Sequence, residues 1–159
     1  MSESSTKKWI AVARILAGAL LVHMALPKFS SAYLEAFPNL LNSWVSGNPF
    51  PWYKSFLQAA GGQHDQTLAM ALAAIEMLAG VGLVLGFLAG LAAILGFLAT
   101  LNHLLATSHL AAGSLPFAAA AWETPNVYLL ILLALLFVAK SGRTWGLAAR
   151  RGSSKSILW

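Results

Sequence analysis

The chain has 159 residues, of which 58% are hydrophobic and only 9% are charged, and its mean hydropathy is +0.71. This is too apolar for an ordinary soluble domain, so the composition predicts a single-domain integral membrane protein. The absence of cysteine excludes disulfides, thiol redox relays and thiolate-bound iron–sulfur or zinc centres, and no metal site is predicted. The net charge of +5 gathers near the ends of the chain, which indicates membrane orientation rather than nucleic-acid binding.

The first apolar run covers residues 9–26 and is long enough to cross a bilayer. It follows two lysines, in the manner of a signal peptide. However, Arg14 interrupts the run, and Pro27-Lys28 stands where a small-residue cleavage site belongs. We therefore expect a retained anchor helix over residues 8–27.

Residues 28–66 are mixed in polarity and rich in aromatic side chains, prolines and glycines. The sequence predicts a long structured outer loop here, with turns at Pro38-Asn39 and at residues 47–51. Residues 52–60 can form a short helix lying at the interface. The aromatic side chains are typical of an interfacial belt, and the alternative is a lid over a site.

The next apolar stretch reads as two membrane-crossing helices, over residues 67–86 and 90–108, that are joined by a tight turn at residues 86–90. Glu76 is the one formal charge among residues 69–107. The small and polar residues fall on one face of each helix, namely Ala69, Ala73, Glu76 and Gly80, and Ala92, Gly96, Ala99, His103 and Ala106. Small residues let backbones approach, so we expect these faces and their polar members to point into the bundle.

A second outer loop over residues 108–125, a fourth helix over residues 124–141 and a basic tail over residues 142–159 complete the predicted chain. The fold class is therefore an all-α, four-helix membrane bundle. Basic residues flank one side of it, namely Lys7, Lys8, Lys140, Arg143, Arg150, Arg151 and Lys155. Because Lys28 and Lys54 alone are expected on the other side, both termini are predicted to be cytoplasmic, with the chain in the inner membrane.

Arg14 and Glu76 are predicted to form an ion pair inside the membrane, since each charge alone would carry a severe desolvation penalty. One interpretation is that the pair only holds the first two spanning helices together. The other is that Glu76 handles protons beneath His23 and His103, which the helical rise places at similar depth. The two roles can coexist.

One cavity is predicted to be lined by His23, Glu76, Asn102 and His103 and roofed by residues 44–56. A quinone needs an apolar slot, a donor at each carbonyl and an acidic group that passes protons, and these four residues supply that inventory.

Two basic residues are predicted to bind substrate. Lys28, at its mouth, and Arg14 are the candidates for binding an anionic substrate. His23 and His103 are also candidates for the two axial ligands of a haem iron. Histidines that ligate a metal normally have second-shell partners, and the sequence shows none for these two, so quinone is favoured over haem.

Several segments, in this order and spacing, resemble the DoxX family and, within it, the DoxD-like branch, the membrane subunit of thiosulfate:quinone oxidoreductases. The matching segments are RILAG at residues 14–18, Pro27-Lys28, Asn48-Pro49, Trp52-Tyr53, EMLAGVGLVLG at residues 76–86, LNHLLA at residues 101–106 and GRTWGL at residues 142–147. The resemblance implies a four-helix membrane bundle and the oxidation of thiosulfate to tetrathionate with electrons passed to quinone. It also implies a second membrane or soluble subunit.

Three functions remain open at this point. The first is a quinone-linked oxidoreductase subunit, and the second is a non-catalytic membrane scaffold that docks a redox or sulfur-transfer partner. The third is a small transporter with Glu76 as its proton site, which four helices without an inverted repeat favour least. The expected partners are the lipid bilayer, quinone and a second subunit, and a homo-oligomer is also compatible with the sequence.

Overall fold

The computed structural model describes residues 3–62, 64–107, 125–143 and 145. Among these residues all regular structure is helical, and no strand occurs. The elements are α1 (Glu3–Ala25), η1 (Leu26–Phe29), α2 (Ser31–Gly47), α3 (Pro51–Ala60), α4 (Asp65–Leu85), α5 (Ala89–Thr107), α7 (Pro125–Val138) and η3 (Ser141–Arg143), where η marks a 3-10 helix. The predicted outer loop over residues 108–125, apart from Pro125, and most of the basic tail lie outside the described residues.

Three described segments are long and apolar enough to cross a membrane, namely Ser5–Phe29, Asp65–Leu85 and Ala89–Thr107. The 14 residues of α7 are equally apolar, but at about 1.5 Å per residue they fall short of a bilayer core of roughly 30 Å. An all-helical membrane protein is therefore confirmed, with three helices of spanning length and a shorter fourth.

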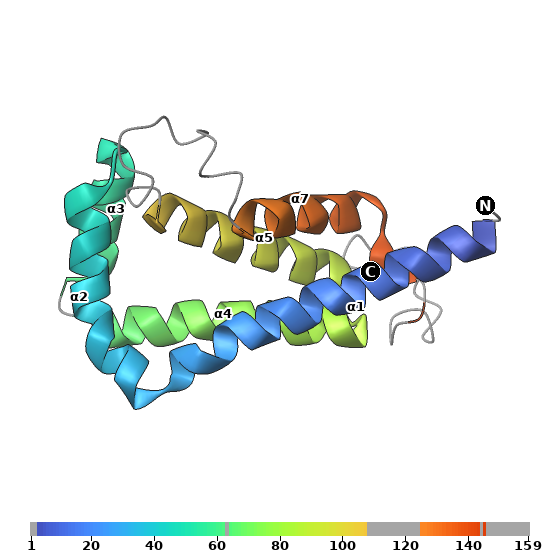
Figure 1. Ribbon diagram of the computed structural model, residues 1–159, viewed down its shortest axis with the longest axis horizontal. Helices are drawn as coiled ribbons and strands as arrows, with labels where there is room; N and C mark the ends of the chain where they lie inside the picture. Colours follow the sequence, from blue (N-terminus) through green and yellow to red (C-terminus); the bar gives the residue numbers. More distant parts are fainter. Residues whose placement is uncertain (1–2, 63, 108–124, 144, 146–159) are drawn as a thin grey trace.

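Helices α1, α4, α5 and α7 lie roughly along one axis, and α2 and α3 stand across one end of them (Figure 1). We refer to the end covered by α2 and α3 as the capped end, and to the end that holds the α4–α5 connection as the turn end. Helix α4 packs against α1 and α5, and α7 packs mainly against α5. The shared core consists of Ala17, Leu21, Ala79, Leu83, Ala92, Ala93, Leu129, Leu133 and Leu136.

Helices α1 and α4 touch through their backbones at two glycines. A Cβ atom on Gly18 would lie 2.7 Å from the carbonyl oxygen of Gly80, and one on Gly80 would lie 2.8 Å from the carbonyl oxygen of Gly18. Even alanine would force the helices apart at this point. The contact therefore fixes the register of the two antiparallel helices.

The predicted reversal between α4 and α5 is confirmed. Gly86 adopts the left-handed conformation with φ of 63°, and its amide donates to the carbonyl of Leu83. The amide of Phe87 donates to the carbonyl of Gly82 at 3.1 Å, which completes a Schellman motif. These bonds satisfy carbonyl groups that would otherwise end the helix unpaired in an apolar environment.

The turn predicted at Pro38-Asn39 is wrong, because both residues lie inside α2. A proline within a helix removes one backbone hydrogen bond, but the flanking residues still follow a helical period. Phe37, Leu41 and Trp44 share one buried face of α2. The burial of that face outweighs the single missing bond.

The segment predicted as a long loop is instead a helical cap made of α2 and α3. Ser30 starts α2, since its hydroxyl oxygen accepts a hydrogen bond from the amide of Tyr33 at 3.2 Å. The turn predicted at residues 47–51 separates the two helices, and the short helix predicted after it is α3. The cap has its own core with α4 and α5, formed by Phe37, Leu41, Trp44, Tyr53, Leu57, Ala69 and Ala106.

Candidate functional site

The centre of the site is a buried ion pair between Lys28 and Glu76. The Nζ of Lys28 donates to Oε2 of Glu76. The side chain of Glu76 is only 6% exposed and that of Lys28 is 18% exposed. The pair thus places a carboxylate inside the spanning helix α4, and the counter-charge comes from η1, which packs against that helix.

The short 3-10 helix η1 explains how Lys28 reaches α4. Pro27 lies in its first turn, and Ser30 closes the turn by donating from both its amide and its hydroxyl to the carbonyl of Pro27. The chain bends here between α1 and α2, and η1 packs against α4. The lysine therefore sits at the capped end, with its long side chain directed to the buried carboxylate.

Tyr33, in the first turn of α2, lies within electrostatic range of Glu76. Burial, together with the negative charge of Glu76, raises the pKa of Tyr33. Its phenol therefore stays protonated at neutral pH. The carboxylate thus binds a lysine at the capped end, with the neutral phenol of Tyr33 within electrostatic range.

A run of aromatic rings leads from Tyr33 to His103 on α5. Ring centroids are 5.9 Å apart for Tyr33 and Phe37, 5.8 Å for Phe37 and Trp44, and 6.2 Å for Trp44 and His103. The last two pairs meet edge to face, a favourable arrangement for aromatic quadrupoles. His103 is half-buried, and it lies within electrostatic range of Lys28.

Tyr53 ties α3 to α5 beside this run. Its hydroxyl lies 2.9 Å from both the carbonyl oxygen and the Oδ1 of Asn102, and because a phenol has one hydrogen it donates to one of them at a time. Burial raises the pKa of Tyr53 to about 12. Asn48 adds a second tie, since its Nδ2 donates to the carbonyl of Leu105 at 2.9 Å.

A cavity of about 30 Å³ lies between the cap and the spanning helices. It is lined by Phe37, Leu41, Trp44, Phe56, Leu57, Ala60, Leu68, Leu72 and Asn102. Of the four residues predicted to share one cavity, only Asn102 lines it. Its volume suits about one water molecule and is far too small for a quinone ring.

The predicted pairing of Arg14 with Glu76 is wrong. Arg14 is fully buried and donates to the carbonyl oxygens of Ser141 and Trp145, each at 2.9 Å. Because Gly18 lies against Gly80, Arg14 is displaced about 6 Å toward the turn end and Glu76 about 6 Å toward the capped end. The prediction assumed that the helix ends were level, which they are not.

His23 lies outside the cluster. It is on the exposed side of α1, whereas Glu76 is buried and His103 is half-buried. The structure therefore joins Lys28 to Glu76 and places His103, the neighbour of Asn102 in the chain, within electrostatic range of Lys28. Arg14 and His23 lie elsewhere. Tyr33 was not predicted as a member of the site, and Trp44 and Tyr53 were predicted only as part of the roof over residues 44–56. The helical spacing of Phe37, Leu41 and Trp44 could have indicated α2.

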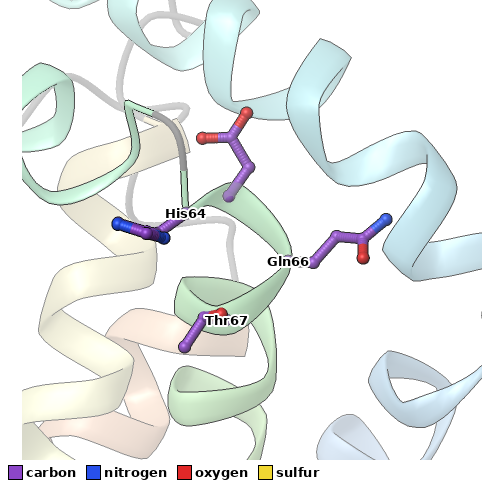
Figure 2. Close-up of a pocket in the computed structure, with 4 residues that line it drawn as sticks. His64, Gln66 and Thr67 are labelled. Carbon is purple, nitrogen blue, oxygen red and sulfur yellow. The ribbon is translucent and has the colours of Figure 1, made fainter.

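A second hollow, of about 230 Å³, lies at the start of α4. It is lined by His64, Asp65, Gln66 and Thr67. Figure 2 shows His64, Gln66 and Thr67 pointing in different directions around the first helical turn. These side chains do not converge on one point, so the hollow offers no set of ligands.

The fold and the site together define a helical membrane protein with a buried, capped ion pair. The sequence model of the DoxX family matches residues 9–109, and the chain therefore belongs to the DoxX family. This is a membrane family often linked to quinone oxidoreductase subunits. The matched region contains Lys28, Glu76 and His103. Comparison with curated proteins and with solved structures gave no match.

Proposed function

We propose that this chain is the membrane subunit of a quinone-linked oxidoreductase and that Glu76 is its proton-handling group. The observation that carries the proposal is the burial of Glu76 in a spanning helix, where it binds Lys28, with Tyr33 within electrostatic range of Glu76 and His103 within that range of Lys28. Titratable groups gathered in a buried site are typical of proton transfer. The link of the DoxX family to quinone oxidoreductases supports the same assignment.

The proposed donor is thiosulfate, by resemblance to the DoxD-like branch. Joining two thiosulfate ions through a new S–S bond gives tetrathionate and releases two electrons. Together with two protons, these electrons convert a quinone to a quinol. The reaction thus needs a proton supply within the membrane, which is the role that we assign to the Glu76 site.

The described residues do not fit a quinone in the cavity that the sequence predicted. His23 is on the outside of α1, Asn102 is hydrogen-bonded to Tyr53, and the space beside it holds about one water molecule. We therefore assign quinone and thiosulfate to the assembled enzyme with a second subunit. This chain provides the anchor and the proton site.

The alternative function is a non-catalytic scaffold, and the close filling of the site favours it. Glu76 is already neutralised by Lys28, and the cavity under the cap is small. In that case the ion pair only joins η1 to α4. The two functions predict different results for a variant in which a neutral side chain of the same shape replaces Glu76. The variant loses activity if Glu76 handles protons and keeps it if the chain is a scaffold.

Thiosulfate-dependent reduction of a soluble quinone analogue, measured in membranes that contain the full chain with its native partners, tests the proposal. Glu76→Gln should lower the rate by at least about tenfold, the lower end of what a positioned proton-transfer group contributes. Gln66→Ala, at an exposed position on the same helix, is the matched control and should keep the wild-type rate. Full activity of a folded Glu76→Gln variant would establish the scaffold function, and an inactive wild type would refute the oxidoreductase.

We also propose that α7 is a fourth crossing helix and that both termini face the cytoplasm of a bacterial-type inner membrane. The start of α1, the α4–α5 turn and the end of α7 lie at the turn end (Figure 1), together with Lys7, Lys8 and Lys140. Excess lysine and arginine mark the cytoplasmic side. A reporter that is active only in the cytoplasm should be active when it is fused to the C-terminus. A reporter that is active only after export should be inactive at the same position.

A further inference from the structure

Helix α1 presents an exposed face that has the spacing of a coiled-coil seam. Trp9, Leu16 and His23 recur every seven residues. The intermediate position of each heptad holds Val12, which is half-buried, Ala19, and Leu26, which is the first residue of η1. Leu16 is 63% exposed and Leu26 is 58% exposed, and Ala19 and His23 are exposed as well. This a and d pattern is the one through which two parallel helices interlock.

His23 is the unusual member of this seam, because it is polar and lies within a spanning segment. It lies in the last turn of α1, and the spanning segment continues for six more residues, to Phe29. Side chains on a helix lean toward its N-terminus, which directs this short imidazole further into the membrane rather than out to water. Among the described residues it makes no hydrogen bond.

Beyond the first turn of α4, the other exposed faces of α4 and α5 are apolar among the described residues. Their large exposed side chains are Met70, Ile75, Leu78, Val81 and Leu85 on α4 and Ile94 and Leu98 on α5. Such residues suit contact with lipid chains. The seam on α1 differs by adding a hydrogen-bonding group that lipid chains cannot satisfy.

We infer that a second copy of this chain covers the seam, with α1 packed in parallel against α1. Two copies inserted in the same orientation are related by a two-fold axis along the membrane normal, and in a parallel pair each a position faces its own mate. His23 would then meet His23 of the other copy. A neutral imidazole has one donor and one acceptor, so the two rings satisfy each other.

Ala19 strengthens the case for close contact, since it is the small residue one turn before His23. Small residues allow helix backbones to approach in membranes. A single polar a position fixes register and stoichiometry in such pairs. The seam is thus self-complementary, whereas a different subunit would have to bring its own matching group.

Cysteine cross-linking in native membranes tests this arrangement without background, because the chain has no cysteine. His23→Cys, or Ala19→Cys on the same seam if the first variant does not fold, should give a disulfide-linked dimer on mild oxidation. Leu98→Cys, 53% exposed on α5, is the control and should cross-link at least about tenfold more slowly, since a disulfide needs Cα atoms within about 7 Å. Equal rates at both positions would indicate random collision and overturn the inference.

A second measurement uses chains without added cysteine. The mass of the purified protein in lipid nanodiscs should be that of a dimer for the wild type and should fall to a monomer for His23→Leu, with an unchanged melting temperature. His23→Asn keeps a donor and an acceptor and should remain dimeric. A monomeric wild type, or a cross-linked product whose mass shows a different protein, would refute the inferred homodimer.

Discussion

Two buried cations stabilise opposite ends of this bundle, and they are neutralised in different ways. At the capped end Lys28 binds the carboxylate of Glu76. At the turn end Arg14 binds the main-chain carbonyls of Ser141 and Trp145. The carboxylate at the capped end can gain or lose a proton, whereas the two carbonyls at the turn end cannot. The turn end is a fixed tie between α1 and the segment after α7.

The largest expected effect is that of Glu76→Leu, which leaves the ammonium of Lys28 without its counter-ion. Removing one partner of a buried pair costs about 3 kcal/mol or more. Denaturant titration of the purified protein in detergent measures this loss. Lys28→Met in the Glu76→Leu background should recover much of the stability, because neither charge is then buried alone.

A double-mutant cycle across the two ends tests whether they are independent. Arg14 and Glu76 are about 12 Å apart along the helix axes, so the effects of Arg14→Met and Glu76→Leu should add within about 0.5 kcal/mol. A strong coupling would contradict the register fixed by Gly18 and Gly80.

The next largest effect is expected for Arg14→Met, which removes both hydrogen bonds to the carbonyls near the turn end. Each charge-assisted bond contributes about 1.5 kcal/mol or more, but methionine also removes the cost of burying the charge, so we expect a net loss of about 2 to 3 kcal/mol. Arg14→Lys keeps the charge but not the planar fork, and should recover only part of it. Faster proteolysis next to Ser141 in Arg14→Met would show that the tie holds this segment, whereas an unchanged cleavage rate would argue against it.

The smallest effect is expected for Tyr53→Phe, which removes the hydrogen bond to Asn102 and costs about 1 kcal/mol at neutral pH. Burial raises the pKa of Tyr53 from its ordinary value of 10.0 to about 12. The protonated phenol is therefore favoured by folding, and its contribution is complete below pH 10 and is lost as the pH rises to 12. Wild-type stability should fall over this window, and the fall should be shallower in Tyr53→Phe.

The sequence by itself determined the helical, membrane-embedded character of the chain, because long apolar runs and the spacing of small residues are local properties. Ala69, Ala73, Glu76 and Gly80 were predicted on one inward face of α4, and all four are buried. The turn at Gly86 could also be predicted from the sequence, since few residues other than glycine adopt a positive φ without strain.

Only the tertiary structure decided which charges meet. Lys28 and Glu76 are 48 positions apart, and their contact depends on the bend at η1 and on the backbone contact between Gly18 and Gly80, neither of which is a local property of the sequence. Packing also decided that α2 continues through Pro38, because burial of one helical face outweighs a missing hydrogen bond. It likewise turned His23 outward, since depth along a helix says nothing about which side a residue faces until its neighbours are placed.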